Sequence, residues 1–255
     1  MLIPGLTSVT FRKLSCLEVI TLAGKAGLPC IEWGGDVHVP HGDLERAREV
    51  KALMADHGLR TSSYGSYYHC GITDQDSEFG KVLETALELN APLIRVWAGK
   101  KGSDKSLPEE RAAVVADSRR IAELAGRAQI GIAFEFHGGT LNDSADAARR
   151  LMAEIEHPNA GTYWQAPVGM PFAECCESLK AVLPFLSNMH VFHWGGRPLK
   201  RMLLSEGNEF WRGYFALAGQ VPGDRHALLE FVQNDDPAVF VDDARTLKAL
   251  VAGKN

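Results

Sequence analysis

The sequence predicts a closed barrel of eight parallel strands, each followed by a helix, known as the (β/α)8 fold. Short apolar runs typical of strands alternate with longer amphipathic runs typical of helices from one end of the chain to the other. Eight such units at about 32 residues each fill the 255 residues, close to the ~250 residues of a parallel barrel. The strand runs are apolar on both faces, as in residues 93–97 and 226–232, which is typical of a parallel sheet covered by helices.

The elements follow one another in strict alternation. The expected strands are residues 3–11, 29–33, 60–68, 92–97, 131–137, 161–165, 188–193 and 227–232. The expected helices are residues 17–26, 43–57, 77–90, 108–128, 144–155, 172–186, 209–218 and 237–252. No linker rich in glycine, serine or proline interrupts the series, so we expect residues 1–255 to form a single domain. The alternative is an open doubly wound sheet, which usually carries a glycine-rich phosphate loop after its first strand; residues 10–15 contain no glycine.

Several expected helices have residues that favour helix ends. Ser15 and Glu18 predict a capping box at the start of the first helix, and Gly27 suits its left-handed end. Gly58 predicts the same kind of end for the second helix. Pro108, followed by two glutamates, suits the first turn of the fourth helix, where negative charge interacts favourably with the helix dipole. The third helix has apolar residues three and four positions apart, the spacing of a face packed on a sheet.

The composition is that of an ordinary globular protein, with 45% hydrophobic and 23% charged residues. It excludes a disordered chain, a collagen-like chain and a coiled coil. The net charge of −5 argues against a nucleic-acid partner. The five cysteines include no CxxC pair and do not form a disulfide framework, so we expect a reducing compartment. No apolar stretch approaches the ~18 residues needed to span a bilayer, and the first residues lack the pattern of a secretory signal. We therefore expect a cytoplasmic protein with no membrane partner.

In parallel barrels, functional side chains gather at the carboxyl ends of the strands and in the loops that follow. The polar residues at those positions are Glu32, Arg95, Lys100, Lys101, Glu135, His137, Gln165, His190, His193 and Glu230. Burying a carboxylate costs free energy unless it is paired or bound to metal. Glu135 and Glu230 both lie within apolar strand runs, so they are the first candidates for a functional site.

Three short motifs resemble those of the xylose-isomerase-like TIM barrels. These are sugar isomerases and epimerases that share their fold with apurinic endonucleases, and they include tagatose 3-epimerase-like and hydroxypyruvate isomerase-like enzymes. Residues 135–137 resemble the family's Glu-x-His at the end of strand five. Residues 190–193 resemble its strand-seven His-x-x-Asp, with His193 at the acidic position, and residues 228–230 resemble its strand-eight glutamate. The resemblance covers essentially the whole chain and implies one divalent metal on Glu135, Gln165, His190 and Glu230.

The sequence departs from the family pattern on strand six. Gln165 stands where the family mostly has aspartate, and Val168 stands where it often has a substrate-binding histidine. The site then has two carboxylates instead of three, so metal affinity is expected to fall. Two carboxylates, an amide oxygen and one imidazole suit Mn²⁺ or Mg²⁺, and Co²⁺ also fits, whereas zinc more often has several His or Cys ligands.

Structural roles compete with the metal-binding interpretation at each of these positions. Glu135 and Glu230 are alternatively structural ion pairs, and Gln165 is alternatively a substrate-facing or structural amide. His190 competes with His193 as the ligand, and the alternation of the strand decides between them. Glu32 is alternatively a partner of Arg95.

The implied activity is that of a sugar isomerase or epimerase. Metal and carbonyl together would acidify a neighbouring C–H, one glutamate of the pair Glu135 and Glu230 would remove that proton, and the other would return it. The expected substrate-binding residues are Glu32, Trp97, His137, His193 and Arg197. A lyase or dehydratase on the same scaffold, and a non-catalytic sugar-binding barrel with a weakened metal site, are the alternatives; a phosphodiester hydrolase is disfavoured by the negative charge. The expected partner is a small sugar, and the sequence leaves a homo-oligomer open.

Overall fold

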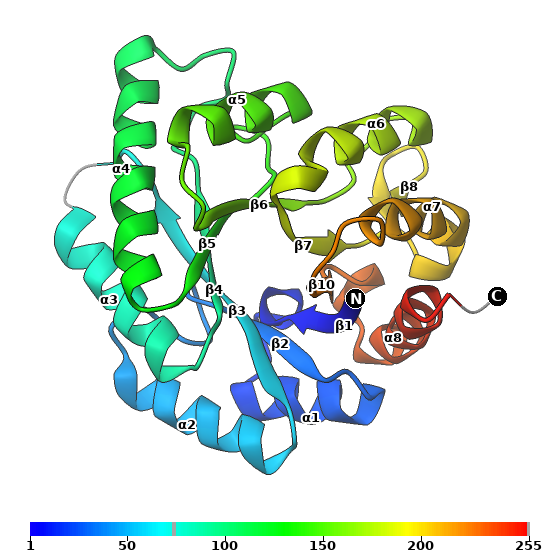
Figure 1. Cartoon of the computed structure of the whole chain (residues 1–255). Helices are drawn as coiled ribbons and strands as arrows, with labels where there is room; N and C mark the ends of the chain where they lie inside the picture. The colour runs from blue at the N-terminus through cyan, green and yellow to red at the C-terminus, as the bar shows by residue number, and fades with distance from the viewer. Residues whose placement is uncertain (73–74, 254–255) are drawn as a thin grey trace.

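The computed structural model of the protein describes residues 1–72 and 75–253 and shows a closed ring of parallel strands surrounded by helices (Figure 1). Within these residues, eight strands pair in the order β1-β2-β3-β4-β5-β6-β7-β10, and β10 pairs with β1 to close the ring. The predicted (β/α)8 TIM barrel is thereby confirmed. The expectation that residues 1–255 form a single domain stays a prediction, and residues 73–74 and 254–255 lie outside the described part.

The bounds of the elements are as follows. The barrel strands are β1 (Leu2–Thr7), β2 (Cys30–Gly34), β3 (Arg60–His69), β4 (Leu93–Trp97), β5 (Gly131–Phe134), β6 (Ala160–Trp164), β7 (Leu186–Val191) and β10 (Arg225–Leu229). The helices are α1 (Cys16–Ala26), α2 (Leu44–Asp56), α3 (Gln75–Glu88), α4 (Pro108–Arg127), α5 (Ala145–Ile155), α6 (Phe172–Val182), α7 (Asn208–Ala218) and α8 (Pro237–Val251). A short hairpin of β8 (Trp194–Gly195) and β9 (Lys200–Arg201) follows β7.

The first strand is shorter than the sequence predicts. It ends at Thr7, and residues Ser8–Phe11 form a 3-10 helix instead of continuing the strand to residue 11. The Ser8 hydroxyl accepts a hydrogen bond from the Gly34 backbone N–H at 2.9 Å, and Thr10 donates to the Leu229 carbonyl at 3.3 Å. These buried polar contacts hold the segment across the mouth of the barrel, which an apolar pattern alone does not predict.

The sixth helix is also shorter than predicted. It ends at Val182, and residues Leu183–Phe185, which include a proline, form a separate 3-10 turn before β7 begins at Leu186. Proline lacks a backbone donor, so the helix cannot continue through it to residue 186. The predicted ends of the first helix are confirmed: Ser15 and Glu18 form a capping box, and Gly27 is left-handed with φ +67°.

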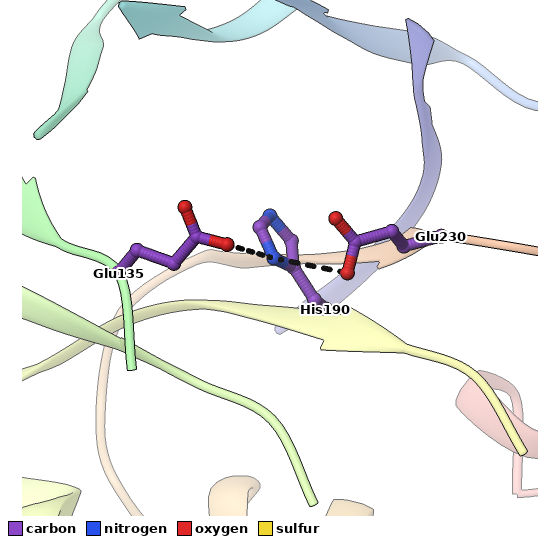
Figure 2. A group of neighbouring side chains, drawn as sticks. All are labelled: Glu135, His190 and Glu230. Carbon is purple, nitrogen blue, oxygen red and sulfur yellow. Dashed lines mark ion pairs between the residues drawn. The ribbon is translucent and has the colours of Figure 1, made fainter. Parts of the chain in front are cut away.

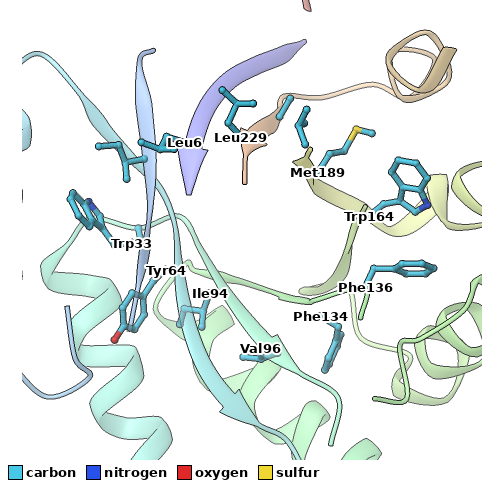
Figure 3. Close-up of a cluster of buried hydrophobic side chains, with 14 of the residues drawn as sticks. Leu6, Trp33, Tyr64, Ile94, Val96, Phe134, Phe136, Trp164, Met189 and Leu229 are labelled. Carbon is cyan, nitrogen blue, oxygen red and sulfur yellow. The ribbon is translucent and has the colours of Figure 1, made fainter. Parts of the chain in front are cut away.

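An apolar layer lies between the barrel and its helices (Figure 3). Its labelled members are Leu6, Trp33, Tyr64, Ile94, Val96, Phe134, Phe136, Trp164, Met189 and Leu229. Side chains alternate along a strand, so the residues between these positions point into the barrel. The interior holds a small second cluster of Cys30, Ala133, Tyr163 and Leu228. Two positions further along each of those strands stand Glu32, Glu135, Gln165 and Glu230, so the alternation places polar groups at the mouth.

Candidate functional site

Three buried side chains meet at the carboxyl ends of β5, β7 and β10. Glu135, His190 and Glu230 each offer one ligand atom, and these atoms all lie within 4.8 Å of one another. Glu135 and Glu230 lie on opposite sides of the His190 ring, with Nδ1 at 3.9 Å from Glu135 Oε1 and 3.5 Å from Glu230 Oε2 (Figure 2). The backbone N–H of each glutamate donates to the neighbouring strand, to Val96 and Val191 respectively. The hydrogen bonds between barrel strands therefore fix the backbone positions from which the two carboxylate side chains extend.

Gln165 completes the predicted set. Its Oε1 lies 3.3 Å from the same nitrogen, His190 Nδ1, although its side chain is only half-buried. The structure thus brings together all four residues that the resemblance implied as metal ligands. Two carboxylates, an amide oxygen and an imidazole nitrogen at one point suit a hard divalent cation, so the residues present fit the expected metal.

A buried arginine lies against this group. Arg95 is 1% exposed; its Nε lies 3.1 Å from Glu32 Oε1, and its Nη1 contacts Glu135 Oε2. The guanidinium also lies over the Tyr67 ring, 5.2 Å from the ring centroid. Its pKa is above the ordinary value, because Glu32 and other nearby groups more than offset the effect of burial. Arg95 therefore carries a fixed positive charge between two carboxylates of the site.

The close approach of Arg95 depends on a glycine. A Cβ added at Gly65 on β3 would lie 2.5 Å from Arg95 Nη2, closer than packed atoms tolerate. Arg95 on β4 and Glu32 on β2 are separated by β3 in the ring, so the arginine side chain crosses β3 where Gly65 has no side chain. The pairing of Glu32 with Arg95, an alternative left open by the sequence, is observed, but across a strand and not between neighbours.

Glu32 accepts hydrogen bonds from two side chains and lies beside a third. Ser63 Oγ and Tyr163 Oη each donate to Oε2 at 2.7 Å, and Oε1 lies 3.3 Å from His190 Nε2. Burial acts to raise the pKa of Glu32, but Arg95 and the neighbouring donors more than offset it, so the pKa lies well below its ordinary value. All these contacts are with protein groups, and Glu32 is 1% exposed. Its expected contact with substrate stays a prediction that this burial does not favour.

Two of the expected substrate-binding residues lie together beside the site. Trp97 packs against His137 with ring centroids 4.7 Å apart, against His69 at 5.3 Å and against Tyr67 at 6.1 Å. His137 is exposed, and its Nδ1 lies 2.7 Å from the Gly138 carbonyl oxygen. Tyr67 and His69 were not predicted, because they lie in a polar strand with no unusual residue pattern. The other three rings thus all pack on Trp97, and Tyr67 joins this cluster to Arg95.

Two further residues expected to bind substrate, His193 and Arg197, lie away from the candidate ligands. His193 lines a cavity of about 230 Å³ with residues of the α6 and α7 region, and none of the four candidate ligands lines it. Arg197 is exposed on the turn between β8 and β9. Strand alternation explains why His190, and not His193, lies beside Glu135 and Glu230: position 190 has the inward parity, and position 193 has the opposite one. In the part of the chain described, neither His193 nor Arg197 forms a hydrogen bond or ion pair with the candidate ligands.

The chain belongs to the xylose isomerase-like TIM barrel family, whose model matches residues 20–167. It is 26% identical over 166 residues to a 3-dehydroshikimate dehydratase from Bacillus anthracis. That match covers 61% of this chain and 58% of the relative, so it spans little more than half of the relative's length. Across the described residues, no helix is both long and apolar enough to cross a membrane.

Solved structures share the fold along almost the whole chain. A probable 3-DHS dehydratase from Bacillus anthracis superimposes with a TM-score of 0.78 at 17% identity, covering 97% of this chain and 99% of the other. A D-psicose 3-epimerase with D-tagatose, from Clostridium cellulolyticum H10, gives 0.73 at 13% identity, with 98% of both chains covered. A xylose isomerase-like TIM barrel protein from Mycobacterium smegmatis, in complex with magnesium, gives 0.72 at 14% identity over 98% and 97% of the chains.

Proposed function

We propose that the protein is a divalent-metal-dependent enzyme that removes a proton next to a carbonyl group of a small sugar derivative. The reaction would end as an isomerisation or epimerisation. The observation that carries this proposal is the pair Glu135 and Glu230, two buried carboxylates on opposite sides of His190 at the barrel mouth. The epimerase among the solved structures with this fold supports it.

Glu135, Gln165, His190 and Glu230 would hold the metal. A divalent cation bound there would supply Lewis acidity that stabilises the negative charge formed on the substrate oxygen. One glutamate accepts the proton from carbon, which leaves an enediolate. The other glutamate, which must carry a proton when the step begins, delivers that proton to the opposite face or to the neighbouring carbon. Arg95 offsets part of the negative charge of the pair, and the ring of Trp97 offers a surface for the C–H face of the sugar.

A second candidate is a dehydratase, favoured by the curated relative and by one of the solved structures, both named as 3-dehydroshikimate dehydratases. Both reactions begin with the same proton removal. They differ in the next step, because a dehydratase expels a hydroxyl group as water from the enediolate, whereas an isomerase or epimerase returns the proton. The product therefore distinguishes them without any assumption about the site.

The test is solvent proton exchange. The metal-free protein is incubated with Mn²⁺ in D₂O with a panel of ketoses, such as D-fructose and D-tagatose, and with 3-dehydroshikimate. With a ketose we expect deuterium at the carbon next to the carbonyl, and an isomeric product, only when metal is present. With 3-dehydroshikimate we expect loss of water only when metal is present, with no deuterium returned to that carbon. Glu135→Gln and Glu230→Gln should each lose about 10²–10⁴-fold in turnover. Glu209→Gln, on α7, is the matched control and should keep wild-type turnover.

One result would refute the proposal. If the wild-type enzyme converts a ketose to its isomer or epimer while deuterium never enters the product, and direct transfer of the proton within the substrate is excluded, the glutamate pair does not perform enediolate chemistry.

A further inference from the structure

A chain of hydrogen bonds runs through the barrel interior and ends on His190. The backbone N–H of His226 donates to Asn188 Oδ1 at 2.9 Å, and Asn188 Nδ2 donates to Tyr163 Oη at 3.2 Å. Tyr163 Oη lies 2.7 Å from Glu32 Oε2, and Glu32 Oε1 lies 3.3 Å from His190 Nε2. We call these contacts the interior chain. It links β10, β7, β6 and β2 below the candidate metal site.

The directions of the hydrogen bonds in the interior chain follow from its two ends, the His226 backbone N–H and the ionised Glu32. A backbone N–H can only donate, so the oxygen of the Asn188 amide faces it and the amide NH₂ faces Tyr163. The Tyr163 oxygen accepts from Asn188, and its own hydrogen goes to Glu32. An ionised carboxylate only accepts. The hydrogen between Glu32 and His190 therefore belongs to His190 Nε2.

The last two steps need Glu32 to be ionised and shielded from water. Arg95 supplies the counter-charge at 3.1 Å, and Ser63 donates a further hydrogen bond at 2.7 Å. The side chains of the interior chain are buried: Glu32 and Tyr163 are 1% exposed, and His190 is fully buried. Bulk water therefore cannot replace a missing donor or reverse the direction of the hydrogen bonds in the interior chain.

We propose that Glu32, Tyr163 and Asn188 are positioning residues that hold His190 in one tautomer, protonated at Nε2 and bare at Nδ1. The bare Nδ1 is the nitrogen that faces Gln165, Glu230 and Glu135 at 3.3, 3.5 and 3.9 Å. The lone pair of Nδ1, the amide oxygen of Gln165 and one carboxylate oxygen each of Glu230 and Glu135 then converge, a donor set that a cation completes. This inference rests on the metal site of the proposed function, and it assigns the atom through which His190 would bind.

The first test reads the tautomer directly. Ring ¹⁵N–¹H correlation spectra are recorded at neutral pH on the uniformly ¹⁵N-labelled, chelator-treated protein. The signals of His190 are assigned among the nine histidines by their loss in His190→Asn. We expect a protonated Nε2 and an unprotonated Nδ1. A proton on Nδ1, in either the neutral or the doubly protonated ring, overturns the proposal.

The second test breaks the interior chain at Tyr163. Tyr163→Phe removes the hydroxyl that donates to Glu32, and loss of such an outer contact typically lowers metal affinity 10–100-fold. The matched control is Tyr64→Phe: Tyr64 is also buried and donates to a backbone carbonyl, that of Val39, at 2.8 Å. Calorimetric titration with Mn²⁺ should show the loss in Tyr163→Phe, and the control should stay within about threefold of wild type.

Equal affinities in the two variants overturn the proposal. The wild-type ¹⁵N spectrum decides the tautomer even if Tyr163→Phe fails to fold. Neither measurement depends on a substrate, so a failure of the proposed enediolate reaction and a failure of this inference are separate results.

Discussion

Replacing Arg95 by methionine tests how the site balances its charges. Methionine retains part of the arginine stem but removes the charge that lies between Glu32 and Glu135. Removing one partner of a buried ion pair costs about 3–5 kcal/mol, because the remaining charge is left uncompensated. We therefore expect the metal-free variant to be destabilised by that amount.

The expected change in melting temperature is large. At about 2–4 °C per kcal/mol for a chain of this size, a loss of 3–5 kcal/mol corresponds to a fall of about 6–20 °C. A divalent cation at Glu135, His190 and Glu230 would replace the missing positive charge. Ligand at 100 times its dissociation constant adds about 2.7 kcal/mol to the free energy of unfolding. Mn²⁺ should therefore stabilise Arg95→Met at least as much as it stabilises the wild type.

Thermal unfolding with and without Mn²⁺ measures both effects. Arg245→Met is the matched control, since Arg245 pairs with Asp242 at 2.8 Å on the exposed face of α8. Exposed pairs contribute about 0–1 kcal/mol, so its melting temperature should fall by less than about 4 °C. A comparably small shift for Arg95→Met, or stabilisation by Mn²⁺ in the wild type alone, would show that Arg95 does not balance the carboxylates.

Three further changes have defined outcomes. Gln165→Asp adds a third carboxylate, worth about 4 kcal/mol per unit charge at ~4 Å before desolvation, so Mn²⁺ should bind at least about tenfold tighter in a titration; unchanged affinity would remove position 165 from the metal site. Burial raises the pKa of Asp243 from 3.8 to about 6, so the folded protein binds this proton more tightly than the unfolded chain does. The free energy of unfolding therefore falls as pH rises from about 4 to 6. Asp243→Asn should flatten the pH profile of urea unfolding in that window and add up to about 3 kcal/mol at pH 7; a profile parallel to wild type contradicts this. Gly65→Ala should lower the free energy of unfolding by about 1–3 kcal/mol, because the added Cβ displaces Arg95. Gly80→Ala, where the added Cβ meets open space on α3, should not destabilise the protein. Urea unfolding measures both.

The barrel could be predicted from the sequence because its signals are local. Each strand is an apolar run of a few residues and each helix has its own spacing and caps, so eight repeats predict eight units. The predicted bounds are wrong where a contact outside the element, or a proline within it, decides where the element ends. Residues Ser8–Phe11 and Leu183–Phe185 turn into 3-10 helices because of a distant hydrogen-bond partner in the first case and a proline in the second.

Glu135 and Glu230 could be named because a carboxylate in an apolar strand is unusual, whereas Gln165 and His190 were predicted from the resemblance to the family's motifs. The structure brings Glu135, His190 and Glu230 together. The interior chain could not be predicted, since Tyr163 and Asn188 are ordinary strand residues whose partners lie on strands far away in the sequence. Strand alternation offers a signal for both residues: Tyr163 stands two positions before Gln165, and Asn188 stands two positions before His190, so each points to the same side of its strand as a site residue.

Closure of the ring between β1 and β10 has a consequence for how the protein assembles. Until β10 is in place, β1 and β7 each present an open edge of unpaired backbone groups, which favours association with other chains. β10 is the last strand of the ring in the described chain, and Glu230 follows it directly. The carboxylate that completes the candidate metal site thus arrives with the strand that seals the sheet. Metal binding would then shift the folding equilibrium toward the closed ring. A partly synthesised chain that lacks β10 would have neither the paired strand edges nor the stabilisation by bound metal.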